Sequence, residues 1–289
     1  TPTNIPVNRY LFNNVHYLSA NLLTSLSKDW EFKANTSYTN NAIDRESVVN
    51  TYDAIGNLTN RTSIANNFYT NQAKGEIIFS KNANKSFFKN TTTYNGLWNT
   101  DKATTVNNNN NANQRNVAPS TSVQNSMSAI VPWKEKLVNV MSFINYRDDK
   151  QDLSVTPASY LQNLDPTLIA NSDLVHQYLN LKTFETIHSA SIGFSKNSWT
   201  FTPEVGLNFS TNKLITDTYG QSNAGIQNFG ADYENNLKFQ KSNPYAQLMI
   251  NYKKGSFEAN LTSPVNFNKI TANDGVKVDR SLTKTTYEP

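Results

Sequence analysis

Short runs in which every second residue is apolar recur along this chain, and they occur in pairs joined by short polar turns. Successive side chains of a β-strand point to opposite faces, so each run predicts a strand with one apolar and one polar face. Five pairs predict five antiparallel hairpins, with turns at residues 27–29, 82–85, 133–136, 195–198 and 253–256. The alternation therefore predicts an all-β fold of about ten antiparallel strands.

The strand after the fourth turn shows the clearest alternation. Its apolar set is Trp199, Phe201, Val205, Leu207 and Phe209, and its polar set is Thr200, Thr202, Glu204, Asn208 and Ser210. Pro203 interrupts the apolar set. Because proline has no backbone N–H to donate, it predicts a bulge or bend at this point.

The connections between the hairpins are predicted to be long loops of about 25 to 37 residues. They hold much of the asparagine-rich sequence, including residues 107–111 and the stretch after Gly220. Compact soluble domains seldom carry several structureless loops of this length, whereas outer-membrane barrels alternate short periplasmic turns with long external loops. The strands also have about the nine to eleven residues that a tilted strand needs to cross a bilayer. We therefore expect an antiparallel transmembrane β-barrel surrounded by outer-membrane lipid.

Aromatic residues and lysines are placed as such a barrel requires. Aromatic side chains gather at the predicted strand ends, at Tyr17, Trp30, Tyr38, Phe79, Tyr94, Trp133, Tyr146, Trp199, Phe209, Tyr252 and Phe257. Lysines lie in or beside all five turns, at Lys28, Lys85, Lys134, Lys136, Lys196, Lys253 and Lys254. Aromatic girdles mark the two interfaces of a membrane barrel, and lysine stems reach toward headgroups. A soluble β-sandwich or solenoid, with one face on a core and one in water, shows similar features and stays open as an alternative.

Composition excludes several other classes of protein. The 289 residues include no cysteine, which removes disulfides, thiolate metal sites and a cysteine nucleophile. The formal net charge is only +4 and the basic residues are scattered, so we do not expect nucleic acid as a partner. No apolar run approaches the roughly 18 residues of a transmembrane helix. The first residues lack the basic and apolar regions of a signal peptide, so the chain is cytosolic, already processed or an excerpt, and we expect an excerpt of something longer.

Two parts of the chain resemble a known family. Residues 8–16 (NRYLFNNVH), followed by Leu22, Leu23 and residues 26–29 (LSKD), resemble a barrel segment of TonB-dependent outer-membrane receptors of the Bacteroidetes type. Residues 142–146 (SFINY) and 153–157 (LSVTP) resemble a later segment of the same barrels. The resemblance implies a barrel of about 22 strands, filled by an amino-terminal plug, that imports a scarce nutrient with energy delivered by TonB.

The chain departs from the family's pattern in the parts that define energy coupling. We find no plug domain, no amino terminus like a TonB box and no terminal strand that ends on an aromatic residue. About ten strands are also fewer than half of those in such a barrel. Residues 1–289 are therefore expected to form an outer-membrane β-barrel segment without a plug domain or signal peptide, and no functional residue of the family can be carried over.

The three histidines do not form a recognisable catalytic site. An omptin-like protease needs an Asp-x-His pair, and no acidic residue lies two positions before His16, His176 or His188. His188 and Ser189 are neighbours in a predicted strand and point to opposite faces, so they do not predict a nucleophile with its base. We expect no enzymatic activity and assign no catalytic residue.

Acidic and inward-facing residues also fit structural positions. Asp148, Asp149 and Asp152 resemble a calcium site in composition, but the start of a solvated loop explains them better, so we assign no metal or cofactor. The predicted inner face carries polar residues of mixed sign, at Glu31, Lys33, Asn35, Lys74, Glu76, Thr202, Glu204 and Asn208. Lumen polarity tunes selectivity in pores and contacts the plug in plugged barrels.

The function we expect is transport across the bacterial outer membrane, as part of the barrel of a TonB-dependent receptor. Its substrate contacts would lie in the long loops and the lumen, and the sequence does not identify the substrate or its binding residues. Further partners would be a surface lipoprotein and, through a plug absent from this chain, TonB. Two alternatives stay open: a small outer-membrane barrel with a role in adhesion or assembly, and a soluble secreted β-sandwich that binds glycans.

Overall fold

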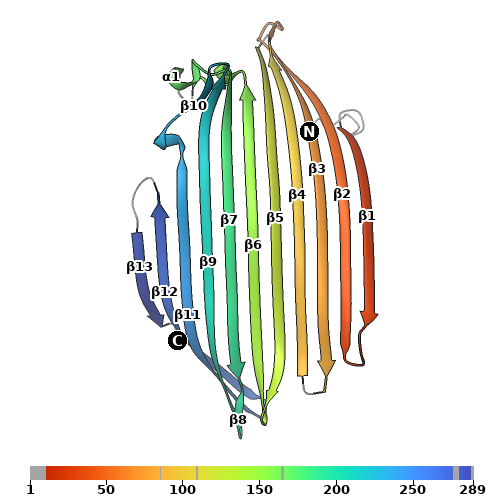
Figure 1. Ribbon diagram of the computed structural model, residues 1–289, viewed down its shortest axis with the longest axis vertical. Coiled ribbons are helices and arrows are strands. Elements are labelled where there is room, and N and C mark those ends of the chain that lie inside the picture. Colours follow the sequence, from red (N-terminus) through yellow and green to blue (C-terminus); the bar gives the residue numbers. More distant parts are fainter. Residues whose placement is uncertain (1–10, 85, 109, 164–165, 276–279, 288–289) are drawn as a thin grey trace.

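The alternating runs form one antiparallel sheet in the computed structural model, which describes residues 11–84, 86–108, 110–163, 166–275 and 280–287. Figure 1 shows the strands side by side, with β1 and β13 at opposite edges. The predicted all-β antiparallel fold is confirmed. The sheet is not closed, because within the described residues β1 and β13 each pair on one side only.

Eleven strands follow one another as a meander. The first six are β1 (Leu11–Ser25), β2 (Trp30–Tyr52), β3 (Leu58–Ala83), β4 (Ser86–Asn107), β5 (Asn110–Trp133) and β6 (Lys136–Thr156). The other five are β7 (Leu174–Ile192), β9 (Trp199–Ser222), β11 (Asn235–Lys254), β12 (Phe257–Asp274) and β13 (Arg280–Tyr287). Two short strands, β8 (Phe194–Lys196) and β10 (Gly225–Asn228), pair with β9 and complete a sheet of 13 strands.

The five short turns lie where the sequence predicts them, all at one end of the sheet (Figure 1), and Lys85 of the second turn lies outside the described residues. Three are two-residue turns whose first residue has a positive φ: Lys134 (54°), Asn197 (54°) and Gly255 (58°). Such turns match the right-handed twist of the strands they join. Pro203 also lies at an interruption in the pairing of β9. Residues Trp199 to Phe201 pair with β8, and pairing with β7 begins at Glu204.

The prediction of long loops between the hairpins is wrong. Most of those residues are the distal halves of long strands, such as β2 with 23 residues and β3 with 26, while residues 157–163, 166–173 and 229–234 belong to connections. Within the asparagine run, Asn107 of β4 lies opposite Asn110 of β5, and Asn111 lies opposite Val106. Asparagine has a low strand propensity, but pairing with a neighbour on each side satisfies the backbone and overrides it.

The connections at the other end contain the little packed core that the sheet has. One includes a 3-10 turn, η2 (Ala158–Leu161), and the helix α1 (Pro166–Ile169), and another includes β10 and a second 3-10 turn, η3 (Ala231–Tyr233). Together with the end of β7 they form the cap cluster, which buries Ala158, Ile169, Val175 and Phe229 and packs Leu161 and Tyr233 against them. No helix in the described part of the chain is long and apolar enough to cross a membrane.

The rest of the sheet is a single layer with both faces open. The chain exposes 18979 Å² of surface, whereas a compact protein of 32.5 kDa exposes about 12,400 Å². No large side chain among the described residues is fully buried. The apolar residues of the strands therefore have no core of their own to enter.

Candidate functional site

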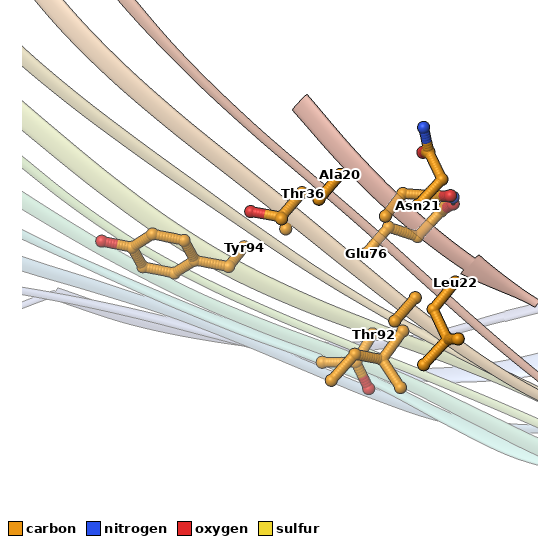
Figure 2. Close-up of a pocket in the computed structure, with 11 residues that line it drawn as sticks. Ala20, Asn21, Leu22, Thr36, Glu76, Thr92 and Tyr94 are labelled. Atoms are coloured by element: carbon orange, nitrogen blue, oxygen red, sulfur yellow. The ribbon is translucent and has the colours of Figure 1, made fainter. Parts of the chain in front are cut away.

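One face of the sheet carries a continuous apolar band next to the short turns. Cross-strand pairing places the alternating residues of successive strands on this same face; for example, Leu22 lies opposite Ala34 and Ala34 opposite Ile77. The band's larger aliphatic members are Leu18, Leu22, Ile77, Val123, Val138, Val140, Ile144, Val205, Leu207, Leu248, Ile250, Leu261 and Val265. Neighbouring side chains leave β1 on opposite sides, as Asn21 and Leu22 do in Figure 2.

The apolar band holds no charged residue of the Asp, Glu, Lys or Arg type in the described strands β1 to β12. Its boundaries are visible on β2, where Phe32 to Tyr38 lie in the band and Asp44 is the first charged residue beyond it on this face. On β9 the band runs from Trp199 to Phe209, and the first charge beyond it is Lys213. The other strands change in the same way, at Lys102, Arg115, Asp148, Lys182, Lys238 and Lys269. The face is therefore apolar near the turns and charged farther away.

Large side chains of the apolar band are open to their surroundings. Val205 is 61% exposed, Leu22 is 55% exposed and Leu261 is 54% exposed. Between β1 and β4 the band is hollowed into a shallow depression of about 400 Å³ (Figure 2), where the methyl groups of Ala20 and Ala34 and the absence of a side chain at Gly75 leave room. An exposed apolar surface of this extent marks contact with another apolar phase or partner.

Aromatic rings border the apolar band on the side of the turns. Trp30 packs against Phe88 with ring centroids 5.7 Å apart, and Trp199 packs against Tyr252 at 4.7 Å. On the far side of the band the aromatic residues are Tyr38, Tyr94, Trp98, Tyr146, Phe184 and Phe209. The rings form two rows, and the band lies between them.

The opposite face is polar, and the predicted inner residues share it. Pairing places Glu31, Lys33, Asn35, Lys74, Glu76, Thr202, Glu204 and Asn208 on this face. Asn35 Nδ2 donates to Glu76 Oε1 at 2.6 Å, and the Tyr245 hydroxyl donates to Glu204 Oε1 at 2.7 Å. Sequence patterning finds the face, but it does not find these cross-strand partners, which depend on register.

The histidines are spread over the sheet. His188 lies in the apolar band opposite Leu207, while Ser189 lies on the polar face opposite Gly206, so the two are not a catalytic pair. His176 lies beyond the band, where its Nδ1 is 3.2 Å from Asp152 Oδ1 and its ring stacks on Tyr219. This contact joins β6, β7 and β9, and sequence reasoning missed it because the residues are far apart along the chain.

The three predicted loop aspartates lie within β6, not at the start of a loop. Asp149 pairs with Arg147 at 2.6 Å on one face, and Asp148 lies 4.0 Å from Lys150 on the other. Alternation thus separates Asp149 from the other two. The described residues include no group of three His, Asp or Glu side chains placed to hold a metal ion.

Ionisable groups beyond the apolar band respond to burial and to one another. Burial, followed by the charge of Glu234, raises the pKa of Asp217 above its ordinary value of 3.8. Burial, followed by the charges of Asp152 and Asp217, also raises the pKa of Tyr219. In the β2–β3 turn, the Asn57 backbone N–H donates to Asp53 at 2.8 Å and lowers the pKa of that carboxyl. These groups belong to the charged end of the sheet.

The arrangement provides a sheet with one apolar and one polar face near the short turns. It brings together no nucleophile, base and acid in the described residues that would indicate a reaction. A comparison of the sequence with models of known families and with curated proteins finds no match.

Proposed function

We propose that this chain forms part of the wall of a transmembrane β-barrel in a bacterial outer membrane, and that the barrel is a TonB-dependent receptor that transports a scarce nutrient. The observation that carries the membrane assignment is the apolar band, which is exposed, holds no Asp, Glu, Lys or Arg in the described strands β1 to β12 and is bordered by aromatic rows. In lipid such a surface is satisfied without any protein partner.

The height of the apolar band supports this assignment. On β9 it extends over ten residue steps from Trp199 to Phe209. At about 3.4 Å per residue and a strand tilt of about 35° to 40°, the band is about 26 to 28 Å tall. Outer-membrane barrels carry an apolar band of about 25 Å.

The stagger of the strands supports a barrel wall. Pairing connects one row of residues from β2 to β11: Asn35, Glu76, Thr93, Gln124, Asn145, Glu185, Ser210 and Lys241. On β2 the row lies seven residues from the turn, counted from Lys28 to Asn35, and on β11 it lies fourteen residues from the turn, counted from Lys241 to Gly255. The row therefore moves about seven residues away from the turns over seven strand steps. With about 3.3 Å per residue and 4.8 Å between strands, the tilt is about 35°, the lower end of the range for barrels.

The number of strands supports a wall that is larger than the described sheet. Eleven antiparallel strands leave β1 and β13 running in the same direction, so closing the meander on itself would make a parallel pair. Single-chain outer-membrane barrels of bacteria have an even number of antiparallel strands, and open edges do not occur in lipid. An odd number of further strands would close this wall, and eleven more would give about 22.

The proposal of transport rests on the size of this barrel and on the family resemblance. A barrel of about 22 strands encloses a wide lumen that receptors of this kind fill with a plug. The polar face would line the lumen, and the distal halves of the strands, with the cap cluster, would project outside. Substrate contacts are then expected on the polar face and among the capped connections.

The mass of the native polypeptide tests this proposal. The polypeptide would be extracted from outer membranes in detergent, identified by peptides of this sequence and weighed intact. A mass of about 100 kDa agrees with a plugged receptor of about 22 strands. A mass near 32.5 kDa would contradict the receptor and leave a small barrel used in adhesion or assembly. Recovery without detergent would contradict the membrane assignment itself.

A further inference from the structure

Positive charge is concentrated at the end of the sheet that carries the short turns. We call this end the turn rim, and its described residues are 26–30, 81–84, 86–87, 133–137, 194–199 and 252–258. Seven lysines lie in it, Lys28, Lys81, Lys134, Lys136, Lys196, Lys253 and Lys254, against the acidic residues Asp29, Glu135 and Glu258. The excess of four positive charges equals the net charge of the whole chain, +4. Outside the turn rim, the described residues hold 16 basic side chains (23 minus 7) and 16 acidic side chains (19 minus 3), which balance each other.

The rim lysines lie against the aromatic row that borders the apolar band. Lys81 Nζ is 5.8 Å from the centre of the Trp30 ring, and Lys134 Nζ is 5.8 Å from that of Trp133. Lys136 Nζ is 5.4 Å from the Phe194 ring. Cation–π contact holds these ammonium groups at the level where the apolar surface ends.

The ammonium groups of the rim remain available to an external anion. Lys253 is the one rim lysine with a carboxylate within 4.0 Å among the described residues, at 3.9 Å from Glu258. Beyond the far border of the band the same face also carries basic residues, at Lys102, Arg115, Lys182, Lys213, Lys238 and Lys269, together with Asp44 and Asp148. Both borders of the band therefore carry basic residues, and among the described residues the turn rim differs in that Lys81, Lys134 and Lys136 lie over aromatic rings.

We propose that the turn rim binds the anionic headgroups of phospholipids in the leaflet that it enters. This inference rests on the proposed membrane function. It adds that the lipids are anionic phospholipids and that the turn rim selects them. Lysine stems extend along the apolar surface and place their ammonium groups at the depth of the phosphates. A lysine near an anionic membrane surface gains about 1 kcal/mol, equivalent to about a fivefold preference over neutral lipid.

Quenching of tryptophan fluorescence by brominated lipids tests the inference. Trp98→Phe leaves Trp30, Trp133 and Trp199 as the tryptophans of this sequence, all of them in the turn rim. The protein is reconstituted into equal mixtures of phosphatidylcholine and phosphatidylglycerol, with bromine on the acyl chains of one or the other. We expect phosphatidylglycerol to be preferred about fivefold at these tryptophans and the preference to fall as salt is raised.

Two matched sets of four substitutions distinguish lipid binding by the rim lysines from attraction by any lysines of the sheet. The rim set is Lys134→Gln, Lys136→Gln, Lys253→Gln and Lys254→Gln, and the control set, on the charged part of the same face, is Lys182→Gln, Lys213→Gln, Lys238→Gln and Lys269→Gln. We expect the rim set to lower the preference to about one and the control set to retain it. Far-ultraviolet circular dichroism checks that both remain folded.

The outcomes distinguish the inference from the proposed function. The rim inference would be overturned if both brominated lipids quench the tryptophans of the unsubstituted protein equally. It would also be overturned if the rim set and the control set lower the preference for phosphatidylglycerol equally. Either outcome would leave the apolar band in lipid. Absence of quenching by either lipid would overturn the membrane function and the rim with it. A rim set that no longer folds leaves the salt dependence of the unsubstituted rim as the deciding measurement.

Discussion

Gly206 gives the tyrosine beside it the space for its hydrogen bond. It lies opposite Tyr245 on the polar face, and a Cβ at this position would overlap the tyrosine ring. The ring lies across the glycine and its hydroxyl donates to Glu204 at 2.7 Å. We expect Gly206→Ala to displace the ring, break this bond and destabilise the sheet by about 1 to 3 kcal/mol. The midpoint of thermal unfolding in detergent measures the loss.

Gly75 is the matched control for this substitution. It lies in the interior of β3, where the nearest atom to a new Cβ would be Tyr94 Cβ at an ordinary 3.9 Å. Gly75→Ala should leave the midpoint unchanged or raise it, since alanine loses less conformational freedom on folding. If Gly206→Ala behaves like Gly75→Ala, the contact with Tyr245 does not limit stability.

Asp217 should make the distal end of the sheet more stable when it is neutral. Burial and the charge of Glu234 raise its pKa above 3.8, so the folded protein disfavours the carboxylate relative to the unfolded chain. This cost is present at neutral pH and is lost as the pH falls from the raised value through 3.8. Asp217→Asn should therefore raise the thermal midpoint at neutral pH and have no effect in acid. A gain that persists unchanged at low pH would show a cause other than ionisation.

The cap cluster is the element whose packing can be tested independently of the sheet. Phe229 is 6% exposed and packs edge to face on Tyr233 with centroids 5.7 Å apart. Phe229→Ala should cost the cluster about 3 to 5 kcal/mol and open the connections that it holds. Limited proteolysis should then cleave between residues 157 and 173 and between 223 and 234. Tyr160→Ala, which removes a ring that is 46% exposed in the same region, should not increase cleavage.

At the scale of elements, the sequence predicts the parts governed by local chemistry. The turns are found because lysine, asparagine and glycine interrupt clear alternation, as at Asn197 and Gly255. The distal strand halves are missed because residues such as Asn40 and Asn71 have low strand propensity and gain their pairing from neighbouring strands, where Asn40 Nδ2 donates to Asn71 Oδ1 at 2.8 Å. Register adds the remaining contacts, including that of His176 with Asp152, which no local pattern carries.

For the molecule as a whole, alternation predicts which residues share a face but not whether the sheet closes. The polar residues predicted for the inner face can be assigned to one face because side chains alternate strictly; they are Glu31, Lys33, Asn35, Lys74, Glu76, Thr202, Glu204 and Asn208. Closure depends instead on the number and direction of the strands, and the prediction of about ten strands missed β13. That strand makes the meander odd, which is the feature that favours a wall with further strands.

The proposed orientation of the whole sheet in the membrane can be measured because the chain contains no cysteine. Single cysteines would be introduced as Val205→Cys in the apolar band, Lys213→Cys beyond it and Ser256→Cys in a short turn.

In intact cells, a maleimide that cannot cross membranes should label the cysteine at position 213 and spare the other two. The thiol at position 256 should react once the outer membrane is opened, because the short turns are expected on the periplasmic side. The thiol at position 205 should react only after denaturation, since lipid excludes the reagent. Labelling of position 256 before position 213 would reverse the orientation, and equal labelling of positions 205 and 213 would place the apolar band in water.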